Sequence, residues 1–427
     1  MKSKLSLVFR SVFISSLLLL FLDSKAFSQE KLTIDSCYIY ARNNYPLIKQ
    51  YQLIASTKEY SVSNASKSYL PQVNVNGQAT YQSDVTKVPI SLPNTTIPTL
   101  TKDQYKIYGE VIQPLTDMII IHEQKELIKN NSIVEEEKLE VELYKLKERI
   151  NQIYFGILLI DAQIKQTELL KKDIQSGIEK TSAALANGTA LKSNLNMLKA
   201  ELLKAGQRTT ELESNRRGYV EMLSLLINKP IDERTNFETP AVRSVALTIN
   251  RPELKLFDAQ KNIFSSQDKL INARNIPRLA LFFQGGYGKP ALNMLNPDFD
   301  FYYIGGLRLS WNISAFYTFK KDKGMLLLNR DMLELQRQTF LFNTQLSLTQ
   351  QQSELKKLQE LISSDDEIIS LRSSIKKTAN TQLENGTITV TDYVSYVNAE
   401  DLATQAKLFH QMQLLMTQYS AQNLSGN

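Results

Sequence analysis

Few side chains of this sequence could carry out catalysis. Its two histidines, His122 and His410, lie far apart along the chain, and its single cysteine is Cys37. An active site needs a convergent set of reactive groups, and neither histidine has neighbours spaced like metal ligands or like the partners of a nucleophile. The P-loop lysine motif that holds nucleotide phosphates is also missing from the sequence. We therefore predict no catalytic residues, no metal site, no cofactor and no enzymatic activity.

A glycine-rich run and an acidic run resemble binding sites, but their context predicts structural roles. Gly285-Gly286-Tyr287-Gly288 lies in a strand-like run and opens no helix, so it predicts a bend or a close-packing position in a strand and not a phosphate cradle. Asp365-Asp366-Glu367 is predicted to be a solvated helix face or a slight break in a helix, and not a metal site. Cys37 is predicted to be a small buried residue, since one cysteine cannot form an internal disulfide.

The N-terminus has the three-part pattern of a secretory signal peptide. Three basic residues precede an uncharged stretch from Ser11 to Leu22, and the small-x-small site Ala26-Phe27-Ser28 follows. The apolar stretch is shorter than the roughly 20 residues that span a bilayer. Removal of residues 1–28 takes away four basic residues and one acid, which lowers the net charge from +6 to +3. So slight a charge does not favour nucleic acid binding.

Most of the chain is predicted to form long helices. Only 15 Gly and 12 Pro occur in 427 residues, and these are the residues that usually end helices. Apolar residues recur at alternating steps of four and three, which is the heptad seam of a coiled coil. Seams run from Leu139 to Ile164, from Leu195 to Leu226 and from Leu328 to Leu346. The helix with the first seam is predicted to extend from about Met118 to Leu185, on the order of 100 Å.

Two regions have the period-2 alternation of β-strands instead. Residues 72–82 alternate polar with apolar side chains, and a second strand-like run follows a loop, which predicts a hairpin over about 71–114. The same arrangement predicts a second hairpin over about 278–313. Its last strand is rich in aromatic residues, which mark the membrane interface in lipid-facing strands. These residues are Phe299, Phe301, Tyr303 and Trp311.

Four strands per chain imply an assembly if they enter a membrane. They are too few to close a barrel, and open strand edges do not occur in lipid. Three chains would supply twelve strands, an allowed even number. If the predicted hairpins enter a membrane, oligomerisation is therefore a consequence of them.

The chain is also an internal duplication. Pro46 and Pro71 are separated by the same interval as Pro252 and Pro277, and each pair brackets a helical segment that leads into a hairpin. Later in each half a long helix is predicted to end, at Asn187-Gly188-Thr189 and at Asn385-Gly386-Thr387. We expect a signal peptide over 1–28 and structural repeats over 29–240 and 241–427.

In their order and spacing these features resemble the TolC family of outer-membrane efflux proteins, from about Leu32 to Leu424. Further marks of the family are Leu32-Thr33-Ile34-Asp35, the run from Ala41 to Pro46, Leu70-Pro71-Gln72 and Arg251-Pro252-Glu253-Leu254. The resemblance implies a mostly α fold with a membrane β-barrel portion. Three chains would form a twelve-stranded barrel in the outer membrane and an α-barrel tunnel of coiled-coil-like helices that extends into the periplasm.

The resemblance also implies a function and partners. The chain would be the outer-membrane channel of a tripartite efflux or secretion system, contacting outer-membrane lipid. It would passively conduct cargo from an inner-membrane pump and a periplasmic adaptor to the exterior. A periplasmic or secreted coiled-coil scaffold with a structural or adhesive role is the alternative, because seams alone do not distinguish the two.

Candidate site residues follow from the same resemblance. Family members often carry two acids after the second glycine turn, which form rings at the periplasmic mouth and favour cations. Asp392 matches the first acid, whereas Ser395 stands at the second, and Asn194 is at the matching place in the first half. Asp392 could equally be an acid that stabilises the start of a helix. The adaptor-docking candidates are the turn residues Gly188, Thr189, Gly386 and Thr387.

Overall fold

The computed structural model describes residues 31–87, 89, 99–242 and 248–427, so the predicted signal peptide lies outside the described residues. Contacts divide the chain into two compact units. The first comprises the described parts of Met1–Tyr45, Leu146–Ser244 and Gln351–Ala421. The second comprises those of Pro46–Lys145, Val245–Gln350 and Gln422–Asn427. Each unit therefore takes segments from both halves of the sequence.

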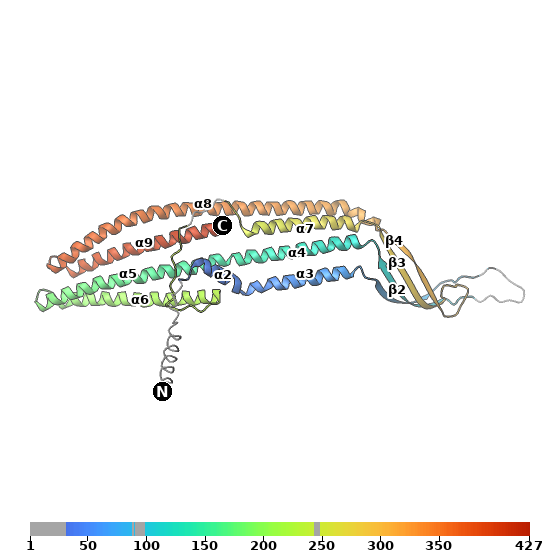
Figure 1. Cartoon of the computed structure of the whole chain (residues 1–427), viewed down its shortest axis with the longest axis horizontal. Coiled ribbons are helices and arrows are strands. Elements are labelled where there is room, and N and C mark those ends of the chain that lie inside the picture. Colours follow the sequence, from blue (N-terminus) through green and yellow to red (C-terminus); the bar gives the residue numbers. More distant parts are fainter. Residues whose placement is uncertain (1–30, 88, 90–98, 243–247) are drawn as a thin grey trace, which may run out of the picture. The chain divides into compact units, whose positions relative to one another are not determined.

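The first unit is helical. It contains α2 (Ile34–Asn44), α5 (Leu146–Ala186) and α6 (Lys192–Ile227), with parts of α8 (Phe316–Glu384) and α9 (Val390–Ser425). Helices α5 and α6 run side by side and are joined by a short turn (Figure 1). Most of the first predicted seam packs inside this unit, because its members from Leu146 to Ile160 are buried.

The predicted helix from Met118 to Leu185 is interrupted at one residue. It consists of α4 (Met118–Tyr144) and α5, with Lys145 between them. The backbone of Lys145 stays in the right-handed helical region, but its N–H turns to the carbonyl oxygen of Leu143. The prediction of one continuous helix was therefore wrong at this residue, where the hydrogen-bond ladder tightens locally.

The second unit contains η1 (Pro46–Lys49), α3 (Gln50–Lys67), α4, α7 (Pro252–Arg274), η2 (Ile313–Ala315) and the first part of α8. Helix α4 contacts α3 and α7. Pro46 and Pro252 occupy first helical positions, where a missing N–H costs nothing. Pro71 and Pro277 follow α3 and α7 and precede a strand, as the repeat predicts.

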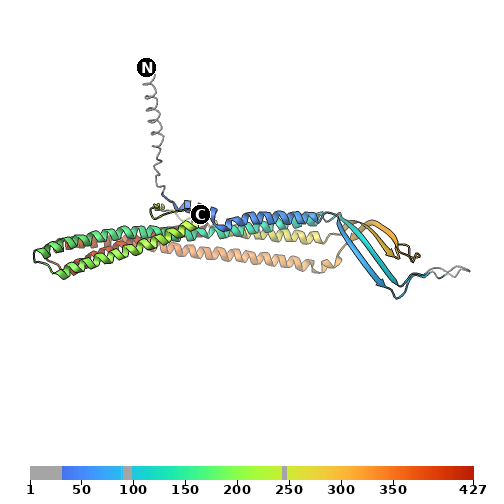
Figure 2. The same ribbon diagram turned by 90° about the horizontal axis from the view of Figure 1, so that it is seen from below.

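The strands of this unit form one antiparallel sheet in the order β1-β2-β3-β4 (Figure 1). They are β1 (Gln72–Tyr81), β2 (Asp103–Pro114), β3 (Arg278–Lys289) and β4 (Asp300–Ser310). Both predicted hairpins are confirmed, and the pairing of β2 with β3 joins them. Figure 2 shows the strands from a second side. The outer edges of β1 and β4 have no strand partner among the described residues.

None of the helices in the described ranges is both long and apolar enough to cross a bilayer.

Candidate functional surfaces

The sheet has one apolar face. Strand register places alternate residues of neighbouring strands on the same side. Between its ends this apolar face has no charged side chain, and large residues stand out from it, with Val75 76% and Phe301 82% exposed. So large an exposed apolar surface marks a contact with lipid or with another protein. The face carries Val73, Val75, Ala79, Tyr81, Tyr105, Ile107, Val111, Leu279, Leu281, Phe283, Tyr287, Phe301, Tyr303, Leu307 and Leu309.

The opposite face, termed the polar face, carries the hydrophilic residues of the same strands. The guanidinium of Arg308 pairs with the carboxylate of Glu110 at 2.8 Å. The amide of Gln284 lies 3.5 Å from the hydroxyl of Tyr302. Strand β1 adds an uninterrupted polar series, which consists of Gln72, Asn74, Asn76, Gln78 and Thr80. The sheet is therefore amphipathic across its thickness.

Aromatic rings gather where the strands meet their loops. Phe299 stacks with Tyr287 at a centroid distance of 5.5 Å and with Tyr105 at 6.4 Å, and Phe301 lies 4.7 Å from Tyr287. The candidates Phe299 and Phe301 thus belong to one cluster, and the ring of Tyr303 packs on the same face. Tyr105 and Tyr287 were missed by the sequence reasoning, because only strand pairing brings them to these rings.

Trp311 lies at the other end of β4, where the chain enters α8. Its indole N–H donates to the carbonyl oxygen of Asn275 at 3.0 Å, and its ring packs edge-on against Phe316. The four predicted aromatic candidates therefore occupy both ends of the strand. Strand β4 spans 11 residues, and transmembrane strands need about 9–11.

The two glycine turns are alike in detail. Gly188 and Gly386 both have a positive φ in the left-handed region, which favours glycine. Thr189 and Thr387 each donate their N–H and their hydroxyl to the carbonyl oxygen five residues earlier, at 2.9 to 3.1 Å. This is the Schellman arrangement that ends helices. All four residues are exposed.

Asp392 forms a capping box at the start of α9. The hydroxyl of Thr389 donates to its carboxylate at 2.6 Å, and the N–H of Asp392 donates to that hydroxyl at 3.1 Å. The reciprocal bonds stabilise the first turn of a helix. Asp392 and Ser395 are both exposed. The carboxylate thus stabilises a helix start and also remains accessible to solvent.

A core close to these turns holds α5, α6, α8 and α9 together. The ring of Tyr393 is buried and lies against Gly177, where an added Cβ would stand 2.7 Å from a ring carbon. Its hydroxyl donates to the carbonyl oxygen of Asp173 at 3.0 Å. Burial raises the pKa of Tyr393 to about 12, so the hydroxyl stays protonated.

Half-buried and buried polar groups add links between the same helices. Lys376 of α8 pairs with Asp173 of α5 at 2.9 Å and with Glu400 of α9 at 3.2 Å. Burial alone would lower the pKa of Lys376, but these carboxylates outweigh that effect and raise it. Asp401 accepts a hydrogen bond from Gln166 at 3.0 Å, and burial raises the pKa of its carboxyl group.

The acidic run on α8 is only partly solvated. Asp365 is buried, with a carboxylate oxygen 2.6 Å from Nδ1 of His410, and Asp366 pairs with Lys407. The prediction of a solvated face was therefore wrong for Asp365, because its partner on α9 is distant in sequence. Within the described ranges no three His, Cys, Asp or Glu residues are grouped as metal ligands would be. Cys37 is buried as predicted.

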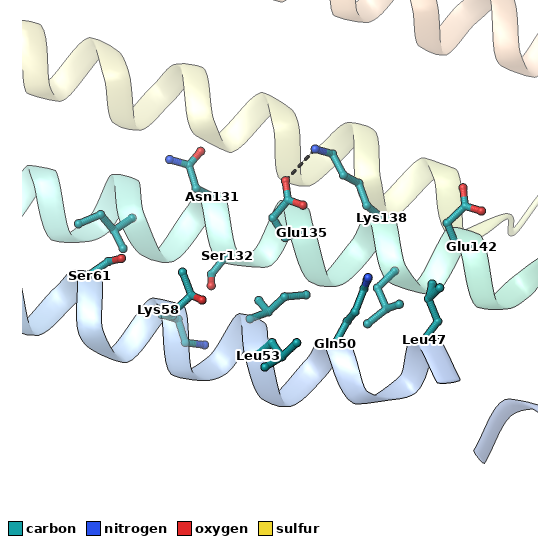
Figure 3. A pocket seen from close by; sticks show the side chains of 14 residues that line it. Leu47, Gln50, Leu53, Lys58, Ser61, Asn131, Ser132, Glu135, Lys138 and Glu142 are labelled. Atoms are coloured by element: carbon teal, nitrogen blue, oxygen red, sulfur yellow. Dashed lines mark hydrogen bonds and ion pairs between the residues drawn. The ribbon is translucent and has the colours of Figure 1, made fainter. Parts of the chain in front are cut away.

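A groove of about 570 Å³ runs between α3 and α4 (Figure 3). Leu47 of η1 and Leu53 of α3 line it together with Glu135 and Lys138 of α4, which pair at 2.7 Å. Neither histidine nor cysteine occurs among the described residues around it.

The chain shares its fold with solved outer-membrane channels. VceC, an outer membrane protein of Vibrio cholerae, matches with a TM-score of 0.65 and 12% identity over 92% of this chain and 96% of its own. CusC matches with a TM-score of 0.67 and 12% identity over 92% of both chains. The open state of the MtrE outer membrane channel of Neisseria gonorrhoeae matches with a TM-score of 0.64 and 12% identity over 92% of this chain and 89% of its own. At these identities the agreement establishes the fold. No protein-family profile and no curated protein sequence matches the chain.

Proposed function

We propose that this chain is an outer-membrane channel of the TolC family, which conducts cargo passively from an inner-membrane pump and a periplasmic adaptor to the exterior. The observation that carries the proposal is the amphipathic four-stranded sheet with two open edges. Its apolar face would contact lipid, and its polar face would line a water-filled interior. The fold shared with the solved channels supports the same role.

The open edges support a homotrimer. A strand edge in lipid leaves backbone N–H and C=O groups without partners, which costs several kcal/mol for each group. Pairing β1 of one chain with β4 of the next satisfies both edges, and three chains close twelve strands. The long helices would continue as a tunnel into the periplasm, and residues 1–28 would be removed on export.

Native mass spectrometry of protein extracted in detergent from isolated outer membranes tests the assembly. We expect a trimer of chains that lack residues 1–28. A monomer or dimer recovered without detergent would instead support the scaffold alternative. Conductance of the purified trimer in a planar bilayer would then test the channel directly.

The exposed glycine turns are proposed to contact the adaptor. Gly188 with Thr189 and Gly386 with Thr387 present two near-identical exposed surfaces, as a repeated partner would require. Their rigid Schellman geometry would lower the entropy cost of docking.

Asp392 is proposed to form a carboxylate ring in the trimer. Asp392→Asn is expected to lower the cation preference of the channel and to weaken block by multivalent cations, because it removes three negative charges from the trimer. The reversal potential in a salt gradient measures this preference. Thr389→Val is the control, since it removes the hydroxyl of the cap but leaves the carboxylate. An unchanged preference in Asp392→Asn would contradict the ring and leave the fold intact.

A further inference from the structure

The polar face of the sheet carries an excess of positive charge. Three cations and two acids stand on it, and one of the acids is already paired with a cation. The second acid, Asp300, lies at the loop end and accepts the N–H of Phe301 at 2.8 Å. The cations are Lys106, Arg278 and Arg308, and the paired acid is Glu110.

Arg308 is held in place from two sides. Glu110 accepts a hydrogen bond from its guanidinium at 2.8 Å, and the guanidinium carbon lies 4.5 Å from the ring centroid of Phe282. The ring of Phe282 lies along Gly306, where an added Cβ would stand 3.3 Å from a ring carbon. Glycine therefore lets the ring approach the sheet closely. The side chain of Arg308 nevertheless remains 45% exposed, so several of its five N–H donors stay available.

Arg278 is a second arginine on the polar face, close to Arg308 in the strand register. Its register partner is Ser310, and Arg308 pairs with Ala280, so the two arginines are diagonal neighbours on one face. Diagonal neighbours in a sheet lie about 7–8 Å apart, within reach of long side chains. Arg278 is exposed, and its side chain makes no ion pair or hydrogen bond with any residue in the described parts of the chain. The two arginines thus stand near the helix end of the sheet, and the guanidinium of Arg308 is directed toward Glu110, on the side away from Arg278.

We propose that Arg278 and Arg308 form an anion-binding step inside the channel, which favours cargo that carries carboxylate, phosphate or sulfonate groups. Guanidinium groups bind such oxyanions through paired N–H donors. In a trimer six guanidinium groups would surround the interior, where low-dielectric walls strengthen their field. The inference rests on the proposed function, because it requires the polar face to line the interior.

Reversal potentials of the purified trimer in a planar bilayer, under a potassium chloride gradient, test this step. Arg278→Gln combined with Arg308→Gln is expected to lower the chloride-to-potassium permeability ratio on the order of threefold. Arg278→Gln alone should lower it less. This single variant separates the effect of the lost charge from an effect on folding, because Arg278 has no ion-pair partner in the described parts of the chain. Replacement of Arg308, by contrast, leaves the carboxylate of Glu110 without its partner.

Lys289→Gln is the matched control. It removes the same charge, but Lys289 is opposite Tyr105 at the edge of the apolar face. We expect its permeability ratio to equal that of the unmodified chain. A ratio that stays unchanged in both arginine variants, with conductance retained, would overturn the anion-binding step alone. Absence of conductance in the unmodified chain would overturn the proposed function on which the step rests.

Discussion

Phe283→Arg is expected to prevent assembly in the outer membrane, whereas Gln284→Arg, one residue further along β3, is expected to be tolerated. Successive residues of a strand point to opposite faces, so Phe283 lies on the apolar face and Gln284 on the polar face. An arginine at the lipid-facing midplane of a barrel costs about 2–4 kcal/mol. Three copies would cost about 6–12 kcal/mol per trimer, which is comparable to the whole stability of a typical domain.

The measurement is the fraction of each variant recovered from outer membranes as a trimer by native mass spectrometry. Phe283→Leu serves as the control, because it changes the shape of the side chain but keeps it apolar. Equal recovery of Phe283→Arg and Gln284→Arg would contradict the assignment of the two faces. Loss of both variants would indicate that β3 tolerates no charge and would leave the assignment without support.

The strands could be predicted closely from sequence because their signal is local. Residues 72–82 alternate in polarity, and β1 covers Gln72–Tyr81. A one-residue slip would move every side chain to the other face, so a sheet with two different faces needs strict alternation. The proline pairs predicted the bounds of two helical segments for the same reason, since each proline restricts the backbone at its own position.

Contacts between distant segments could not be predicted in this way. The hydrogen bond between His410 and Asp365 and the packing of Tyr393 on Gly177 each join two helices, and no periodicity specifies which residues meet. The pairing of β2 with β3 is of the same kind. The alternation predicted the two hairpins, but it specifies neither the residues that pair within them nor those that pair between β2 and β3.

The third seam shows a different limit. Its apolar members from Leu328 to Leu346 are 53 to 68% exposed in the single chain. A heptad seam predicts that a partner exists, but it does not say whether the partner belongs to the same chain. In the proposed trimer a neighbouring copy would cover this stripe. The sequence thus shows that a helix has an apolar stripe, whereas the helix that packs against this stripe is determined by the assembly.

Tyr393→Ala is expected to destabilise the first unit by about 3–5 kcal/mol, the usual cost of removing a large buried aromatic side chain. Tyr393→Phe should cost only about 0.5–1.5 kcal/mol, because it loses one hydrogen bond, to the carbonyl oxygen of Asp173, and keeps the ring. Urea unfolding in detergent, followed by far-UV circular dichroism, measures both. Tyr396→Ala is the matched control on the same helix, since Tyr396 is exposed and its removal should leave the free energy of unfolding nearly unchanged.

The contact with Gly177 allows a sharper test, because it determines whether a second substitution, Gly177→Ala, lowers or raises the free energy of unfolding. With Tyr393 present, Gly177→Ala places a methyl group 2.7 Å from a ring carbon and is expected to cost about 1–3 kcal/mol. In the Tyr393→Ala background the ring is absent, and the same change should stabilise by about 0.5–1 kcal/mol, because alanine favours helix more than glycine does. A double-mutant cycle measures this coupling. Additive costs would show that the Tyr393 ring does not lie on Gly177, and the link between α5 and α9 would then depend on the Lys376 ion pairs and on the hydrogen bond from Gln166 to Asp401.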